Sequence, residues 1–409
     1  MSDPGDYLLL LGASADQLCS IHAARALGIP VVTVDANPAS PGFAHADAHA
    51  VVSTRDVPAL KAFADRFQAS GKRIGGVLVQ GTDIPQIGAE LALHLGLPSI
   101  PLEAAMIATD KLRMKEHFRA HGIPVPWFRA VTSLEELQTV VSERGFPLVL
   151  KPVDRSGARG VYLLTEGCDL AALHAASLRE SLCGRLIVEA FTPGPQLSTE
   201  SLVIDGVVHT PGWADRNYEH LATFAPNIIE NGGFVPTACT PAQRAAVEDL
   251  ISACARALGV RNGVIKGDIV IGPDGPAVIE VALRLSGGDF SATLIPLGTG
   301  VDIIRVAILR AMGRPVDPAA LVPTRDHAVI NQYFFPPPGR LRAITGLERV
   351  EGKPWLHKLE IWRRPGDTLP VIRCHADRAG VFIVTAPTRA EAEARAREVN
   401  ASIQFHVEP

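Results

Sequence analysis

The sequence predicts a protein of several domains that combines an α/β fold with α+β regions. Strand and helix patterns alternate over the first hundred residues, which is typical of a parallel sheet. After Pro101 the pattern changes to strands joined by turns and loops, and a junction near residue 323 opens a third region of strand-like runs with one helix. With 409 residues the chain is long enough for several cores. We therefore expect domains at 1–100, 101–320 and 321–409.

The composition argues against several classes of function. Lys and Arg number 39 against 43 Asp and Glu, a net charge of −4, which argues against a nucleic-acid partner. The longest apolar runs are too short to cross a bilayer, and no basic residue precedes the first of them, so we expect neither a membrane span nor a secretory signal. The six cysteines form no CxxC pair, which argues against a zinc site or a disulfide framework. The expected location is the cytoplasm.

The first region alternates buried strands with helices. A continuous apolar run predicts a strand at Tyr7–Leu11, as expected when both faces of a sheet are covered. Further strands are expected at 31–34, 51–53 and 75–79, and helices at 16–27, 56–70 and 85–95. The turn at Gly12 lacks the spacing G-x-G-x-x-G, and a lone Asp35 after a strand is usually a turn residue. We therefore reject a nicotinamide site here.

A polar glycine loop, residues 152–161, lies in the middle region between two predicted strands, 147–151 and 161–165. Backbone N–H groups of such a loop, with flanking cations, can fold over phosphates. It is not a P-loop, because no GK[ST] opens a helix. The other elements expected in the second and third regions are helices at 105–121, 134–145, 240–258 and 388–400, a buried strand at 185–190, an edge strand at 197–204 turning into 207–209, and a hairpin of 264–271 and 277–281.

Two carboxylates on the predicted hairpin form a candidate metal site. Asp268 and Glu280 lie on its two arms, and counting inward from the turn puts both on the same face. Oxygen ligands alone suit Mg²⁺ that also binds nucleotide phosphates. The alternative is a solvated hairpin, but Glu280 stands in the apolar stretch 277–283, where a carboxylate needs a partner or a metal. His45 and His49, by contrast, lack a further ligand group and are rejected as a metal site.

At these positions the chain resembles the ATP-grasp family, and the match runs over almost the whole sequence. The motifs, in order, are Thr109-Asp110-Lys111 with the run 121–126, Val149-Leu150-Lys151-Pro152 with the glycine loop, the run 187–191 with Gly194, and finally Asp268, Glu280 and Arg284. The run 280–288 further resembles the L-amino-acid ligase branch. The resemblance implies an ATP-grasp fold with an N-terminal Rossmann-like parallel-sheet domain and a small C-terminal α+β cap.

The resemblance also implies a role for each matched residue. Lys111 and Lys151 would contact the nucleotide phosphates, Ser156, Gly157 and Gly160 would form a flap, Glu189 and Phe191 would meet adenine, Asp268 and Glu280 would bind Mg²⁺ or Mn²⁺, and Arg284 would steady the transferring phosphoryl group. Two positions depart from the family pattern. Gln196 stands where many members place a ribose-binding Glu, and its amide can still hydrogen-bond there. Ala282 replaces the Asn that usually serves as third metal ligand, which changes the expected metal geometry.

The implied activity is that of an ATP-dependent carboxylate–amine ligase. ATP would phosphorylate a small carboxylic acid to an acyl phosphate, and an amine would then displace phosphate to give an amide or peptide, with at least one amino acid as substrate. The expected substrate residues are Trp213, Asp215, Arg216, Glu230, Ser286 and Gly287. The polar stretch 213–220 is equally typical of a surface loop. A homodimer is expected from the frequency of such assemblies alone.

Two other functions stay open at this point. One is a carboxylase or carbamoyl-type enzyme that phosphorylates bicarbonate, since the N-terminal layout is shared with such enzymes. The other is a nucleotide-binding protein that has lost catalysis, which only Ala282 favours and which the five residues Lys111, Lys151, Asp268, Glu280 and Arg284 oppose.

Overall fold

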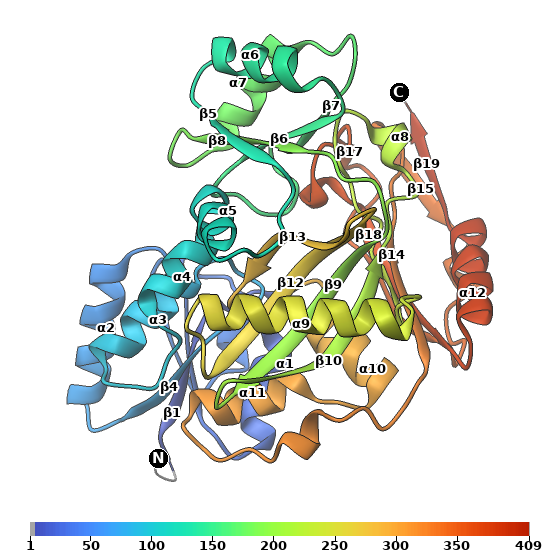
Figure 1. Ribbon diagram of the computed structural model, residues 1–409. Helices are drawn as coiled ribbons and strands as arrows, with labels where there is room; N and C mark the ends of the chain where they lie inside the picture. Colours follow the sequence, from blue (N-terminus) through green and yellow to red (C-terminus); the bar gives the residue numbers. More distant parts are fainter. Residues whose placement is uncertain (1–4, 409) are drawn as a thin grey trace.

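The computed structural model describes residues 5–408. Figure 1 shows the N-terminal region in blue beside a large central sheet, a smaller sheet with two helices above them, and the C-terminal region in red on the opposite side. Within the described residues, no helix combines the length and the apolar composition needed to traverse a lipid bilayer.

The N-terminal region is a parallel sheet of four strands, as predicted. Its order is β3-β2-β1-β4, and each neighbouring pair is parallel. The elements are β1 Tyr7–Leu11, β2 Val31–Asp35, β3 Ala48–Val51, β4 Ile74–Val79, α1 Leu18–Ala26, α2 Val57–Ala69 and α3 Pro85–His94. The strand expected at 51–53 is wrong, since β3 ends where that range begins. β3 is an edge strand whose residues alternate between half-buried and exposed, so it lacks the apolar run that marks a buried strand.

The helix expected at 105–121 is in fact two helices, α4 Leu102–Thr109 and α5 Lys111–Ala120. Asp110 separates them in an extended conformation, with φ −112° and ψ 109°. Its carboxylate accepts the backbone N–H groups of Leu112 and Arg113, which makes it the N-cap of α5. Lys111 consequently stands in the first turn of a helix rather than in the middle of one.

A small antiparallel sheet lies above the central one (Figure 1). Its order is β5-β8-β6-β7, with β5 Phe128–Val131, β6 Leu148–Pro152, β7 Tyr162–Leu164 and β8 Leu186–Ala190. Helices α6 Leu134–Arg144 and α7 Leu170–Glu180 belong to the same unit, and residues of α6 share one apolar cluster with β6, β7 and β8. The glycine loop joins β6 to β7, as the sequence predicts.

The central sheet has eight strands in the order β13-β12-β9-β10-β11-β14-β18-β16, with antiparallel neighbours throughout. Its strands are β9 Gln196–Ile204, β10 Val207–Arg216, β11 Gly233–Val235, β12 Gly263–Gly272, β13 Gly275–Ala282, β14 Ala328–Tyr333, β16 Leu356–Ile361 and β18 Gly380–Ala386, and helix α9 Pro241–Ala257 packs on it. One expectation is wrong here: the predicted edge strand is interior, because β9 pairs with both β12 and β10. The segment 213–216, for which the sequence left a surface loop open, belongs to β10.

The region from 321 to 408, called the cap below, does not have a sheet entirely of its own. Its strands β14, β18 and β16 extend the central sheet, while β15 Gly339–Thr345, β17 Thr368–Leu369 and β19 Gln404–Glu408 form a second sheet, accompanied by α12 Arg389–Ser402. The remaining elements are α8 Leu221–Phe224, α10 Ile295–Thr299, α11 Ile303–Ala311, a π-helical turn at Phe290–Leu294, and 3₁₀ turns at Ala15–Gln17, Pro41–Ala44, Pro318–Leu321, Leu347–Arg349 and His375–Asp377.

Packing also crosses the first predicted boundary. Helix α11 shares one apolar core with β1 and α1 of the N-terminal region, through buried residues such as Leu8, Ile21 and Ile303. A β-bridge joins Gln80 to Leu285, and the N–H of Gly81 donates to the carbonyl of Leu285 at 3.0 Å. The end of β4 is thus fastened to the segment that follows β13.

Candidate active site

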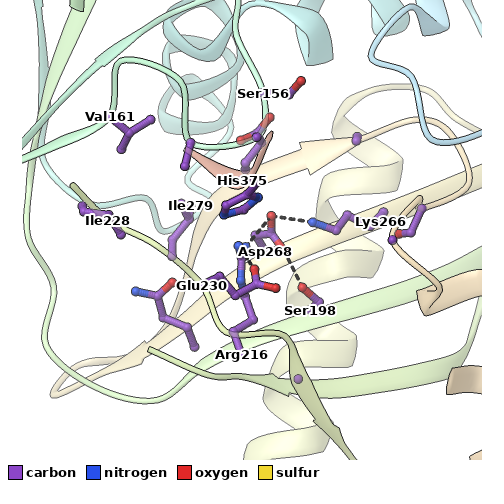
Figure 2. Close-up of a pocket in the computed structure, with 18 of the residues that line it drawn as sticks. Ser156, Val161, Ser198, Arg216, Ile228, Glu230, Lys266, Asp268, Ile279 and His375 are labelled. Atoms are coloured by element: carbon purple, nitrogen blue, oxygen red, sulfur yellow. Dashed lines mark hydrogen bonds and ion pairs between the residues drawn. The ribbon is translucent and has the colours of Figure 1, made fainter. Parts of the chain in front are cut away.

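One cavity of about 520 Å³ gathers side chains from the N-terminal loops, the small sheet, the central sheet and the cap. Every predicted site residue lies on its wall except Gly160 and Trp213. The residues brought together are Lys111, Lys151, Ser156, Gly157, Glu189, Phe191, Gln196, Asp215, Arg216, Glu230, Asp268, Glu280, Arg284, Ser286 and Gly287. Figure 2 shows Asp268 near the centre of this pocket, with Ser198 and Lys266 directed toward it.

Lys111 is buried and lies between two elements of the site. Its Nζ is 3.1 Å from Oε1 of Glu280 and donates to the backbone carbonyl of Arg155 at 2.7 Å. Burial alone would lower the pKa of this ammonium, but the carboxylates of Glu280 and Asp83 raise it above its usual value. Lys111 therefore stays charged on the cavity wall, where it can meet an anion.

A second lysine that the sequence analysis did not select lies beneath the site. Lys115 is 0% exposed, and its Nζ is 3.3 Å from Oε1 of Glu189, the same oxygen that lies 2.8 Å from Nζ of Lys151. Burial lowers the pKa of Lys115 to about 8, and the two lysines hold the pKa of Glu189 below its usual value although its burial would raise it. The spacing of four residues from Lys111 within one helix was the available signal.

The carboxylate pair is arranged as predicted. Asp268 and Glu280 are directly opposite each other in the β12–β13 register, and both line the cavity. Asp268 lies 2.7 Å from Nη1 of Arg216 and 2.5 Å from Nζ of Lys266, and it accepts the hydroxyl of Ser198 at 2.7 Å. Its burial would raise the pKa of this carboxyl, but the two cations hold it well below the usual range. Asp268 is therefore ionised at neutral pH.

These donors fit a magnesium ion that is shared with phosphates. Across residues 5–408, no three His, Cys, Asp or Glu side chains converge on one point, and Ala282 lines the cavity at the position of the missing third ligand. Mg²⁺ is commonly held by only one or two carboxylates together with substrate phosphates and water. Asp268 and Glu280 satisfy that requirement, provided that a phosphate completes the coordination.

Arg284 is oriented by a residue of the N-terminal region that the sequence analysis missed. Its Nε and Nη2 lie 2.8 and 2.5 Å from Oδ1 of Asp83, in the loop between β4 and α3. Burial opposes ionisation of Asp83, yet Arg284 and Lys111 lower its pKa to about 2. The position of Asp83 just beyond the carboxyl end of a parallel strand was a usable signal, because ligands and functional groups gather at that edge.

The glycine loop lies against the cap. Gly157 and Ala158 have φ of +67° and +61°, and the carbonyl of Gly157 accepts the backbone N–H of His375 at 3.1 Å. His375 also lines the cavity, and burial together with Arg378 and Arg216 holds its pKa well below the usual range. Gly160 supports the loop from behind, because a Cβ there would come within 3.0 Å of Pro152 and Glu180.

The predicted substrate residues divide into two groups. Nη2 of Arg216 lies 2.5 Å from Oε2 of Glu230. The N–H of Ser286 donates to Oε1 of the fully buried Glu200 at 2.8 Å. These contacts fix Arg216, Glu230 and Ser286 as parts of the cavity wall. The carboxylate of Asp215 accepts the hydroxyl of Thr237 and forms an ion pair with Arg389, so it belongs to the same group.

Trp213 belongs to the core instead. Its indole N–H donates to the carbonyl of Thr210 at 2.9 Å, and Arg244 lies 5.6 Å from its ring centroid. The indole is buried in one apolar cluster with Leu197 and Ile251.

Comparison with known proteins agrees with this arrangement. Residues 109–290 match the family model described as the ATP-grasp (A) domain of phosphoribosylglycinamide synthetase, and residues 332–408 match L-amino acid ligase C-terminal domain 2. A D-alanine–D-alanine ligase of Gloeobacter violaceus is 31% identical over 196 residues, which cover 46% of this chain and 63% of the relative. An uncharacterized protein of Sinorhizobium fredii, y4rH, is 27% identical over 95% of this chain and 80% of its own length.

A solved structure gives the same result for the fold. The crystal structure of L-amino acid ligase from Bacillus licheniformis has a TM-score of 0.83 to this chain at 19% identity, and the match covers 100% of both chains. The two matched domains and the shared fold lead to one assignment: residues 109–290 are an ATP-grasp domain, and residues 332–408 are a C-terminal domain of the L-amino acid ligase type.

Proposed function

We propose that this enzyme joins a small carboxylic acid to an amine, with at least one amino acid among its substrates, through an acyl phosphate and with release of ADP and phosphate. The observation that carries the proposal is the convergence of two kinds of group on one cavity. Lys111, Lys151 and Arg284 supply fixed positive charge, and the facing carboxylates Asp268 and Glu280 supply hard oxygen donors.

The first step activates the acid. A carboxylate does not react with an amine, because its leaving group would be an oxide. An oxygen of the carboxylate attacks the terminal phosphorus of ATP, the P–O bond to ADP breaks, and a C–O–P link forms. The three cations offset the charge that spreads over the equatorial oxygens during this transfer. Mg²⁺, when held by Asp268 and Glu280, would neutralise further charge on the nucleotide phosphates.

The second step forms the amide. The amine nitrogen attacks the acyl carbon, the C–O bond to phosphate breaks, and the nitrogen releases a proton. Lys111 and Arg284 offset charge on the departing phosphate, and their own carboxylate partners, Glu280 and Asp83, keep both side chains oriented. The glycine loop, which lies against His375 of the cap, would keep water from the acyl phosphate.

The test is phosphate release from ATP and Mg²⁺ with pairs drawn from amino acids and small carboxylic acids, followed by mass spectrometry of the products. We expect release that requires two substrates and a product whose mass is their sum minus water. Release that depends on bicarbonate alone would replace the proposal with the carboxylase hypothesis. ATP binding without release across the panel would favour a protein that has lost catalysis.

A further inference from the structure

Four side chains share the face of the β12–β13 hairpin that carries the candidate metal ligands. Asp268 is directly opposite Glu280 in the strand register. Lys266 is directly opposite Ala282 in the same register, and all four residues line the cavity. Because alternate residues of a strand point to the same side, Lys266 shares its face with Asp268. This face, called the metal face below, therefore presents two carboxylates, one ammonium group and one methyl group.

The ammonium of Lys266 is directed at one of the two acids. Its Nζ lies 2.5 Å from Oδ2 of Asp268, and Figure 2 shows the side chain turned toward that carboxylate. Within residues 5–408, Asp268 is the carboxylate with which Lys266 forms an ion pair. Glu200 stands opposite Lys266 on β9, but it accepts the N–H of Ser286 and the hydroxyl of Ser291 instead. The positive charge of Lys266 thus belongs to the metal face.

The carboxylate of Asp268 has little capacity left for metal ions. An ionised carboxylate offers about four lone-pair positions. Oδ2 contacts Nη1 of Arg216 at 2.7 Å and Nζ of Lys266 at 2.5 Å, and Oδ1 accepts the hydroxyl of Ser198 at 2.7 Å. About one position therefore remains. Asp268 can share one divalent ion with Glu280, but it cannot also serve a second.

A second ion would find no other donor on the metal face. Enzymes that move phosphoryl groups with two divalent ions use the pair to stabilise both the attacking and the leaving oxygens. The methyl group of Ala282 supplies no ligand for such an ion. The ammonium of Lys266, by contrast, is a compact positive charge with three hydrogen-bond donors. Unlike a metal ion, it is attached to the chain and cannot dissociate.

We propose that Lys266 takes the place of a second divalent ion, so that each bound nucleotide is accompanied by a single ion. The inference rests on the proposed ligase function, because ATP with Mg²⁺ is the substrate there. It adds the number of ions and names the residue that replaces one of them. When the nucleotide is bound, the ammonium supplies positive charge to the phosphates beside Ala282, where the protein has no metal ligand.

The experiment counts the ions directly. Mn²⁺ is titrated into the protein in the presence of a saturating, non-hydrolysable imido analogue of ATP, and the free Mn²⁺ is measured by electron paramagnetic resonance. For the wild type we expect one Mn²⁺ per bound analogue. Ala282→Asn adds an amide oxygen opposite Lys266 and should still bind one. The double variant Lys266→Met/Ala282→Asn should bind two, because the loss of the ammonium frees a position on Asp268.

Phosphate release gives a second readout of the same replacement. Lys266→Met alone should keep one ion but lose about 10²-fold in kcat, because nothing replaces the missing positive charge. Adding Ala282→Asn should recover about tenfold of that loss at saturating Mn²⁺, since a second ion then supplies the charge. The matched control is Lys72→Met, an exposed lysine that does not line the cavity, for which we expect the wild-type ion count and kcat.

Three results would overturn the role of Lys266. The first is two ions in the wild type, and this arm needs no variant. The second is a second ion in Ala282→Asn alone, and the third is one ion in a double variant that still binds the analogue, because in either case the lysine would not determine the count. Failure of the wild type to bind the analogue would instead contradict the proposed ligase function.

Discussion

The cavity has a phosphate side, with Lys111, Lys151 and Arg284, and a cap side, with Arg378, and the positive charges of the two sides are neutralised differently. On the phosphate side, the three cations Lys111, Lys151 and Arg284 each contact a carboxylate of the protein, as Lys151 contacts Glu189 and Arg284 contacts Asp83. On the cap side, Arg378 contacts the carbonyl of Glu230 and the ring of Tyr333 but forms no ion pair with a carboxylate of residues 5–408. The difference indicates that carboxylates of the protein neutralise the three cations of the phosphate side even when no nucleotide is bound.

Glu280→Gln tests the phosphate side most strongly. The amide cannot supply the anionic oxygen that faces Asp268, and it leaves Lys111 without its carboxylate partner. We expect ATP-dependent phosphate release to fall by about 10²- to 10³-fold in a folded protein. Asp274→Asn, at the exposed turn of the same hairpin, is the control and should retain wild-type turnover. Turnover retained in Glu280→Gln would contradict the assignment of this carboxylate.

The buried group of Lys115, Lys151 and Glu189 tests how the positive charges of the phosphate side are neutralised. Glu189→Gln would leave Lys115 and Lys151 facing each other without an anion, and we expect a loss of roughly 3–5 kcal/mol in the free energy of unfolding, measured with urea. Lys115→Met removes only one cation and relieves its desolvation, so the change should stay within about 1 kcal/mol. Equal losses in the two variants would contradict this account of the triad.

The contact between Asp83 and Arg284 predicts a pH dependence. The pKa of Asp83 is lowered to about 2 from 3.8, so its ionised form stabilises the folded state above pH 4 and this contribution disappears as the pH falls through 2. Asp83→Asn should therefore lose about 2 kcal/mol at pH 7 relative to the wild type, and the difference should vanish near pH 2. Urea unfolding at several pH values measures it, and a difference that did not change with pH would contradict the ion pair.

Trp213 provides the smallest expected effect. Trp213→Phe removes the hydrogen bond to Thr210 but changes nothing on the cavity wall. We expect a loss of about 1 kcal/mol in stability and unchanged kcat/KM for both substrates. A selective rise in the KM of one substrate would restore Trp213 to the substrate site, where the sequence had placed it.

Features that depend on local pattern could be predicted from the sequence. The apolar run at Tyr7–Leu11, the capped helix α9 and the β12–β13 hairpin each follow from neighbouring residues, and the hairpin register alone was enough to pair Asp268 with Glu280. The ATP-grasp resemblance then selected Lys111, Lys151 and Arg284, all of which line the cavity. These are positions where one segment of the chain determines both the geometry and the chemistry.

Features that depend on distant contacts could not be predicted in the same way. The sequence does not show that Asp83 meets a side chain 201 positions later, nor that Arg378 contacts Glu230 across 148 positions. The break at Asp110 was missed for a different reason. The apolar pattern continues through it, and only the side-chain capping bonds reveal that the helix restarts. β9 was mistaken for an edge strand because its alternating pattern resembles that of a half-exposed strand, although β12 and β10 cover both its edges.

The bridge between Gln80 and Leu285 has a consequence for how this protein can be divided. The counter-ion of Arg284 comes from the N-terminal region, and the segment after β13 that carries Arg284 is hydrogen-bonded to that region's last strand. The segment 101–408 is therefore not a transplantable module. An exchange of N-terminal regions between relatives would replace part of the reaction centre, so chimaeras need their junctions placed with Asp83 and Arg284 inherited from the same parent.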